Sequence, residues 1–392
     1  MVTAECHAHI FMDGVDYKKA AAAHENGPRE DLIREHLAAY QKAGISYVRD
    51  GGDPYGAGVL ARSLAPEYGI TYRTPVFAIH RAGRYGKIVG RAFSDWKEYC
   101  ALVREVRRAG GDFIKIMTTG ILDFATKGHV TSEPLSREEV FAMTAAAHDA
   151  GLSVMAHVNG AQAVMDAAEA GVDSVEHGNF QNEESICCMA EHATIWVPTI
   201  VTVSNLLENG RYPAETLAWI FETQKKGLQL AFEKDVVLAA GSDAGAYGVL
   251  HGKGIREEES VMRKILGAEN GQELEKRLAF GEKKDPGKVL KIFCVSGFRK
   301  NLELNGQTNA CAFARTMVSL NHFTRTLEKM KQGYSETEGK CYPLFFACKN
   351  DSHGCPHRRK GANESKGKLG LQGFFPSFSG GGMVSDASIL RL

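Results

Sequence analysis

The chain has 392 residues, of which 44% are hydrophobic and 24% charged, a composition typical of globular proteins and unlike that of disordered or fibrous chains. No run approaches the roughly 18 consecutive apolar residues that a membrane-spanning helix needs, so we expect no membrane segment. The formal net charge is zero, but residues 296–392 carry 14 Lys and Arg against 7 Asp and Glu, whereas residues 1–295 carry 33 against 40. This asymmetry predicts that the C-terminal region is a different kind of segment.

The N-terminal residues and the cysteines indicate the compartment. The first residues contain no charged region followed by an apolar run, so they predict no signal peptide. The 9 cysteines are odd in number and irregularly spaced, which argues against the disulfide framework of a secreted protein. We therefore expect a cytoplasmic protein.

Short β-rich runs alternate with longer helical patterns from residue 3 to about residue 283. The predicted strands are 3–10, 45–49, 72–79, 112–117, 152–157, 172–176, 194–199 and 236–242. Several of them are nearly continuous apolar runs, as expected of strands that are buried on both faces of a parallel sheet. The amphipathic segments between them include 28–43, 94–109, 136–150, 160–170 and 212–234.

Several predicted helices end at a glycine that suits a helix C-terminus, namely Gly44, Gly110, Gly151 and Gly171. Eight strands with helices between them favour a (β/α)8 barrel, the TIM-barrel fold of the α/β class, over an open doubly wound sheet. No Gly-x-Gly-x-x-Gly follows the first strand, which removes the main argument for a dinucleotide-binding fold. We predict one barrel domain over residues 1–293.

The regular alternation stops beyond about residue 293. The following segment is rich in Gly, Ser, Lys and Asn and has no sustained hydrophobic period, so we predict an irregular tail over residues 294–392. It contains five soft metal ligands, Cys341, Cys348, His353, Cys355 and His357. Their spacing is not that of a standard zinc site, and the basic cluster at 358–360 is too small to predict nucleic acid as a partner.

The first predicted strand ends in a pair of histidines. Residues two apart on a strand point to the same face, so His7 and His9 both face the interior of the predicted barrel. Two imidazoles on one face are ready ligands for a metal such as zinc. Alone, a His-x-His pair is weak evidence, and its value depends on what the other strands supply.

Four more metal-competent residues interrupt the other apolar strands. Lys115 lies inside the fourth strand, where a charged amine is costly unless it is neutralised or paired. His157 and His177 end the fifth and sixth strands, and Asp243 ends the eighth. A buried, hydrogen-bonded histidine or a helix N-cap explains each of them singly. Catalytic groups of TIM barrels gather at the carboxyl ends of the strands, however, and chance is a poor explanation of six such residues there.

The order, spacing and strand context of these six residues resemble the amidohydrolase superfamily. The local sequences Asp-Phe-Ile-Lys-Ile (112–116), Ala-His-Val-Asn-Gly (156–160), Ser-Val-Glu-His-Gly (174–178) and Gly-Ser-Asp-Ala-Gly (241–245) are similar to its imidazolonepropionase-like and prolidase-like branch. The resemblance covers roughly residues 1–293. It implies a hydrolase that acts on a carbon–nitrogen bond of a small-molecule substrate. It also implies two divalent metal ions for each chain, with zinc as the expected metal.

The resemblance also implies a role for each residue. His7, His9 and Asp243 would hold one metal, and His157 and His177 the other. The lysine of the fourth strand, carboxylated on its amine, would bridge the two, because carboxylation turns the buried cation into an anionic oxygen ligand. The expected chemistry is hydrolysis by a water whose pKa the metals lower toward neutrality, with Asp243 as the general base.

Three residues are weaker candidates for substrate contact. Arg81 and Arg84 follow the third strand, where they would bind a substrate carboxylate, although a solvated basic loop explains them equally well. His251, in the loop after the eighth strand, resembles a substrate-side histidine of the family and is a second catalytic candidate. The histidines of predicted helices and loops are expected on the surface, namely His24, His36, His148 and His192.

The sequence departs from the family at its ends. Many members carry a small β-sandwich built from both chain ends, and this sequence has no segment that resembles it. The leading hypothesis is hydrolysis of an amide, a cyclic amide or a dipeptide-like bond. A lactone or phosphoester hydrolase with the same metal centre and a catalytically disabled metal-binding barrel are the alternatives. Enzymes of this size often form symmetric homo-oligomers, and that question stays open.

Overall fold

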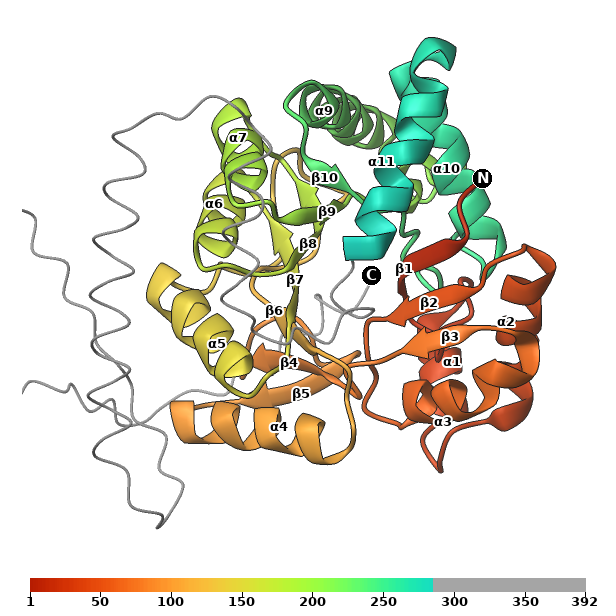
Figure 1. Cartoon of the computed structure of the whole chain (residues 1–392), viewed down its shortest axis with the longest axis vertical. Helices are drawn as coiled ribbons and strands as arrows, with labels where there is room; N and C mark the ends of the chain where they lie inside the picture. The colour runs from red at the N-terminus through yellow and green to blue at the C-terminus, as the bar shows by residue number, and fades with distance from the viewer. Residues whose placement is uncertain (285–392) are drawn as a thin grey trace, which may run out of the picture. The chain divides into compact units, whose positions relative to one another are not determined.

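The computed structural model describes residues 1–284, whose arrangement Figure 1 shows. The predicted tail at 294–392, with its cysteines and histidines, lies outside the described residues, as does the predicted domain boundary at 293. Among residues 1–284, no helix combines the length and the apolar character needed to cross a bilayer.

Short parallel strands alternate with helices along the chain. The strands are β1 (Ala4–Ala8), β2 (Tyr47–Asp50), β3 (Thr71–Arg73), β4 (Ala78–Arg81), β5 (Gly90–Phe93), β6 (Ile114–Met117), β7 (Val154–Asn159), β8 (Ser174–Asn179), β9 (Ile195–Val197) and β10 (Val237–Leu238). The α-helices are α1 (Tyr17–Ala23), α2 (Glu30–Lys42), α3 (Ala57–Leu64), α4 (Trp96–Arg108), α5 (Arg137–Asp149), α6 (Ala161–Glu169), α7 (Glu183–Glu191), α8 (Val201–Ser204), α9 (Ala214–Glu233), α10 (Lys253–Leu266) and α11 (Gly271–Lys284). Two 3-10 helices, η1 (Ala65–Tyr68) and η2 (Ala268–Asn270), complete the described part.

The strands form two parallel sheets. Their orders are β1-β2-β3 and β10-β9-β8-β7-β6-β4-β5. The helices lie around the outside of the strands, as crossovers between parallel strands require (Figure 1). Backbone contacts also join β1 to the segment that follows β10. The Cys6 N–H donates to the Ala240 carbonyl at 2.9 Å, and Ala8 forms a parallel bridge with Ala244. The predicted parallel α/β architecture is confirmed.

The predicted closed barrel is not confirmed, because the strand ladders are interrupted where we predicted one strand over 72–79. The chain bends there between β3 and β4. Pro75 has no N–H to donate to a ladder, and Val76 adopts a positive φ of 70°, which a β-branched residue rarely does. The structure also has a strand that we did not predict, β5, which pairs with β4. The last predicted strand, 236–242, is shortened to β10.

The predicted helix ends are confirmed. Gly44, Gly110, Gly151 and Gly171 all have left-handed φ values between 72° and 81°. At the other end of α5, Ser136 and Glu139 form a capping box, in which each side chain accepts from the backbone N–H of the other residue. Local sequence therefore fixes where these crossover helices begin and end.

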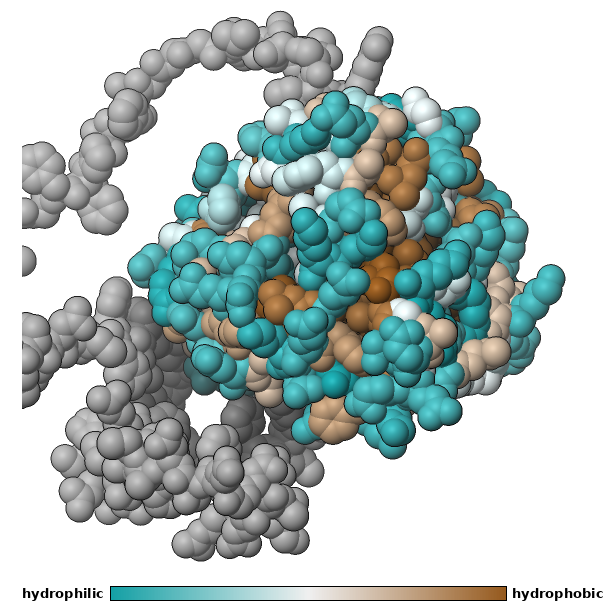
Figure 2. Space-filling model, turned by 90° about the horizontal axis from the view of Figure 1, so that it is seen from above, coloured by the Kyte–Doolittle hydropathy of each residue, from teal (hydrophilic) through white to brown (hydrophobic). Residues whose placement is uncertain are grey.

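The core is mostly apolar, but it also contains several fully buried charged side chains. Glu5, Arg49, Lys115 and Glu176 are each at most 1% exposed. Figure 2 shows that the face seen from the top of Figure 1 is mainly hydrophilic, with apolar patches between the polar side chains. Asp50, Asp53 and Glu258 are buried equally well, and because charged side chains are almost never fully buried without partners, each of these groups needs a partner or a functional role.

Candidate metal centre

Four histidines and one aspartate meet at the carboxyl ends of the strands. One ligand atom each from His7, His177 and Asp243 lie within 4.8 Å of one another. Asp243 Oδ1 is 3.5 Å from His7 Nε2 and 3.6 Å from His9 Nε2. The ring centroids of His157 and His177 are 4.7 Å apart. The structure therefore brings together side chains from β1, β7, β8 and the segment after β10.

Three of the four histidine rings have one nitrogen bound to a carboxylate or carbonyl oxygen, and one nitrogen of the fourth ring, His177, faces a hydroxyl group. The contacts are His7 Nδ1 to Glu176 Oε2 at 2.7 Å, His9 Nδ1 to the Gly52 carbonyl at 3.3 Å, His157 Nε2 to the Gly120 carbonyl at 3.1 Å and His177 Nδ1 to Thr199 Oγ1 at 2.7 Å. Carboxylates and carbonyls only accept, so the nitrogens that face them carry the proton. The second nitrogen of His7, His9 and His157 is left for a metal, which is the arrangement of metal-binding histidines. The Thr199 hydroxyl allows the same for His177 when it accepts from the ring Nδ1.

The electrostatics of the rings also suit metal binding. Burial is the largest cause that lowers the pKa of all four histidines, to about 3 for His9 and His157. The rings are therefore neutral near pH 7, the state in which imidazole donates its lone pair to a metal.

Lys115 of β6 is the unusual member of the cluster. It is 1% exposed, and its Nζ has no hydrogen-bond partner among the residues that the structure describes. Burial lowers the pKa of Lys115 to about 8, and the charges of Glu176 and Asp243 oppose that shift. An orphaned buried amine beside four neutral imidazoles and a carboxylate fits a group that acts as a metal ligand in modified form.

Asp243 lies where the chain turns after the eighth predicted strand. Its φ is 60°, and that of His177 is 66°, so both side chains stand on backbone conformations that non-glycine residues rarely adopt. The Asp243 N–H donates to the His7 carbonyl at 2.7 Å. Burial raises the pKa of Asp243 to about 7, and the charge of Lys115 opposes that shift. In the metal-free chain, burial therefore disfavours the charged carboxylate, a cost that a bound cation would offset.

Two buried glutamates form hydrogen bonds with the candidate ligands or with their backbone, and the sequence analysis gave them no role. Glu176 accepts from His7, from Arg49 at 2.8 Å and from the Ser174 hydroxyl at 2.6 Å. Glu5 accepts from the backbone N–H groups of His7 and Ser242 and from the Ser242 hydroxyl. Burial raises the pKa of Glu5 to about 8. Glu5 precedes His7 by two residues on one strand face, and this spacing was the available signal.

We expect Glu176→Gln to weaken metal binding by roughly 10–100-fold, because outer partners of metal-binding histidines contribute that much to affinity. The substitution keeps the shape of the side chain but removes the anion that orients His7 and faces Arg49. The measurement is a Zn²⁺ titration in competition with a chelating dye. Glu139→Gln, which removes a partly exposed ion pair with Arg81, is the control and should bind like the unmodified chain. Equal affinity in both variants would contradict the role of Glu176.

The three candidates for substrate contact have protein partners. Arg81 pairs with Glu139 at 2.7 Å, and Arg84 donates to the Glu133 carbonyl at 3.3 Å. His251 uses both ring nitrogens within the protein. Their substrate and catalytic roles stay predictions. The expected surface position is wrong for His24, which is 1% exposed.

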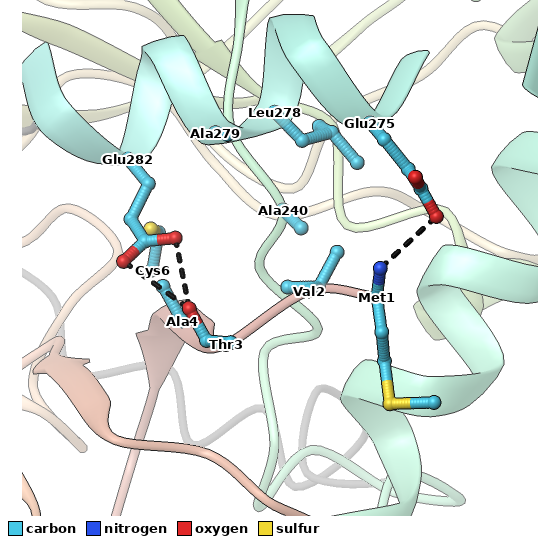
Figure 3. Close-up of a pocket in the computed structure, with 10 residues that line it drawn as sticks. All are labelled: Met1, Val2, Thr3, Ala4, Cys6, Ala240, Glu275, Leu278, Ala279 and Glu282. Carbon is cyan, nitrogen blue, oxygen red and sulfur yellow. Dashed lines mark hydrogen bonds and ion pairs between the residues drawn. The ribbon is translucent and has the colours of Figure 1, made fainter. Parts of the chain in front are cut away.

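A small cavity of about 80 Å³ lies between β1 and α11, away from the cluster (Figure 3). Its carboxylates are already bound: Glu275 accepts from the Met1 ammonium at 3.0 Å, and Glu282 accepts from the Thr3 hydroxyl at 3.2 Å. The lining contains none of the residues of the metal cluster. We assign no function to this cavity.

Comparisons with known proteins identify the family of the chain. The family model described as "Amidohydrolase family" matches residues 5–254. The chain is 30% identical over 201 residues to an uncharacterised protein of Mycobacterium tuberculosis, a match that covers 48% of this chain and 53% of that protein. It is 25% identical over 279 residues to the ochratoxinase of Aspergillus niger, covering 62% and 57%. The chain thus spans about half the length of the curated relatives it matches.

Two solved structures have folds similar to that of this chain. A Xaa-Pro dipeptidase with bound methionine in its active site matches with a TM-score of 0.56 and 25% identity over 71% of this chain and 75% of that one. The A. niger ochratoxinase matches with a TM-score of 0.56 and 21% identity over 70% and 68%. From the family match over residues 5–254, we conclude that this chain belongs to the amidohydrolase family.

Proposed function

We propose that the protein is a metal-dependent hydrolase that cleaves a carbon–nitrogen bond of a small molecule. One observation carries this proposal: four neutral histidines lie together with a buried carboxyl group and with a lysine amine that has no partner among the described residues, and three of the rings keep one nitrogen for a metal. Such a donor set suits divalent zinc. The family to which the chain belongs supports the same reaction class.

The ligands divide into two groups in this proposal. His7, His9 and Asp243 would hold one metal, and His157 and His177 would hold a second. Lys115, carboxylated on its amine, would supply an anionic oxygen ligand to both. Its lowered pKa favours the neutral amine, which would add to carbon dioxide and release one proton to water. When bound, the metals lower the pKa of a water and polarise the scissile carbonyl.

Asp243 is the proton carrier of the proposed reaction. Its carboxylate takes a proton from the attacking water and returns it to the leaving nitrogen, so that the amine departs neutral. Its rigid turn, with the backbone N–H bonded to the His7 carbonyl, keeps the carboxyl group beside the ligands.

We also propose that the two sheets together form the wall of a TIM barrel. The backbone bond from Cys6 to Ala240 and the bridge from Ala8 to Ala244 support this closure on one side. The cluster then lies at the carboxyl-terminal mouth of the barrel, where small substrates enter.

A substrate screen tests the reaction class. The names of the similar proteins, a Xaa-Pro dipeptidase and an ochratoxinase, direct the choice to dipeptides and N-acyl amino acids, with cyclic amides, lactones and phosphoesters beside them. We expect release of a free amine from at least one amide substrate by the Zn²⁺-loaded chain. Hydrolysis confined to lactones or phosphoesters would overturn the carbon–nitrogen assignment and keep the metal centre.

Removing the metals is expected to lower thermal stability as well as activity. A ligand at 100 times its Kd stabilises the folded state by about 2.7 kcal/mol, which corresponds to a Tm change of roughly 5–10 °C for a domain of this size. Differential scanning calorimetry before and after chelation, and again after Zn²⁺ is restored, measures the effect. A Tm that does not respond to chelation or restoration would contradict metal binding by the folded chain.

A further inference from the structure

Two loops that carry metal-centre residues interlock through their backbones. The segment 9–14 begins at His9, and the segment 243–249 begins at Asp243. The His9 N–H donates to the Ala244 carbonyl at 2.8 Å, and the Gly14 N–H donates to the Gly245 carbonyl at 3.1 Å. A Cβ on Gly245 would lie 2.6 Å from the His9 carbonyl oxygen. The loops are therefore in direct backbone contact, and a shift of one moves the other.

His251 fixes this pair of loops from the side. It is 7% exposed, and its Nε2 lies 2.8 Å from the Met12 carbonyl, to which it must donate. Its Nδ1 accepts from the hydroxyl of Tyr40, a fully buried residue of α2, at 2.9 Å. The hydroxyl thus selects the tautomer of His251 that binds the loop after β1.

His36, also on α2, completes the arrangement. Its Nδ1 lies 2.9 Å from the Ile10 carbonyl, and its ring stacks on that of His251 with centroids 4.0 Å apart. Burial lowers the pKa of both histidines, so two neutral rings can stack without charge repulsion. Carbonyls on both sides of Phe11, directly after the ligand strand, are therefore held by histidines from two different parts of the chain.

We propose that His36, Tyr40 and His251 form a latch that positions His9 and Asp243 for metal binding and proton transfer. His251 is then a positioning residue and not a group that contacts substrate. The latch sets the place of the two loops, and the loops set the distance of 3.6 Å between His9 Nε2 and Asp243 Oδ1. This inference rests on the proposed metal centre.

Donor-preserving and donor-removing substitutions test the latch. His251→Leu and His36→Leu remove the donors to Met12 and Ile10, whereas His251→Gln and His36→Asn place an amide N–H near the position of the lost ring nitrogen. Tyr40→Phe removes one hydroxyl and keeps the packing. His148→Leu is the control. His148 belongs to α5 and pairs with Asp173 at 2.9 Å, and neither residue is part of the latch or of the metal cluster.

The readouts are the Zn²⁺ dissociation constant by competition with a chelating dye, and urea unfolding of the metal-free chains. We expect the leucine variants to bind Zn²⁺ roughly 10–100-fold more weakly, as loss of outer support does for metal sites. The amide variants should recover most of that loss, Tyr40→Phe should fall between, and His148→Leu should change stability alone.

The outcomes separate the latch from the metal centre itself. If the unmodified chain binds no Zn²⁺, the proposed function fails. If it binds Zn²⁺ and the folded leucine variants bind equally well, or the amide variants lose as much affinity as the leucine variants, the latch is wrong. If the leucine variants do not fold, Tyr40→Phe decides, and unchanged affinity in that variant overturns the proposal.

Discussion

Replacing Asp243 by asparagine is expected to lower turnover by roughly 10²–10⁴-fold, the range that a positioned general base contributes. Asparagine keeps an oxygen that can bind a metal and tolerates the left-handed φ of 60° at this position. It cannot accept a proton at neutral pH. The variant should therefore retain much of the bound metal and lose most of the activity, measured as kcat at saturating substrate together with metal content.

A matched control for this substitution exists at the start of the same predicted strand. Asp235 also has a left-handed φ, of 57°, but its side chain is 82% exposed and pairs with Arg277. Asp235→Asn should leave both kcat and metal content unchanged. Undiminished hydrolysis by Asp243→Asn would show that another group moves the proton.

Replacing Lys115 by methionine is expected to stabilise the metal-free protein and to abolish the second metal. The pKa of Lys115 falls from 10.5 to about 8 on folding, so the unfolded chain binds the proton more tightly than the folded chain. Below pH 8 this difference costs about 3 kcal/mol of stability. The cost disappears as the pH rises from about 8 to 10.5, because the amine is then neutral in both states.

Urea unfolding of the metal-free chains at several pH values measures this effect. Lys115→Met should be more stable than the unmodified chain by about 3 kcal/mol at pH 7, and the difference should vanish above about pH 10.5. The same variant should bind fewer metal ions and lose most activity, since methionine cannot be carboxylated. Lys97→Met, on the exposed face of α4, is the control and should show no such pH dependence. Full metal content in Lys115→Met would contradict the proposal that Lys115 is a metal ligand.

The strand pattern allowed most of the metal cluster to be predicted. His7, His9, His157, His177 and Asp243 all follow or end apolar runs, and the structure brings them together because carboxyl ends of parallel strands meet at one edge. Lys115 was recognisable because a lysine inside an apolar strand needs an explanation. These signals are local and lie on one strand each.

The residues that support the cluster were harder to predict because their partners come from distant parts of the chain. Nothing next to His251 in sequence indicates that Tyr40 and Met12 occupy its two nitrogens. His24 was expected on the surface, yet it is buried, and its Nδ1 accepts from the Arg29 N–H. Such tertiary contacts leave no periodic pattern.

The unbroken strand ladder of the predicted barrel is absent from the described residues for a local reason. The run at 72–79 is apolar enough for one strand, but Pro75 lacks the N–H that a ladder needs, and Val76 adopts a positive φ there. The strand β5 was missed because its sequence, Gly-Arg-Ala-Phe, has little of the β-branched character of buried strands. Two sheets therefore replace the single barrel ladder in the structure.

The metal content of the unmodified chain tests the central claim most directly. After the metal-free chain is incubated with Zn²⁺ and bicarbonate and dialysed, inductively coupled plasma mass spectrometry gives the number of ions for each chain. We expect two zinc ions for each unmodified chain, and one or none for each Lys115→Met chain. A chain that is folded and retains no zinc would contradict the metal centre and, with it, the proposed function.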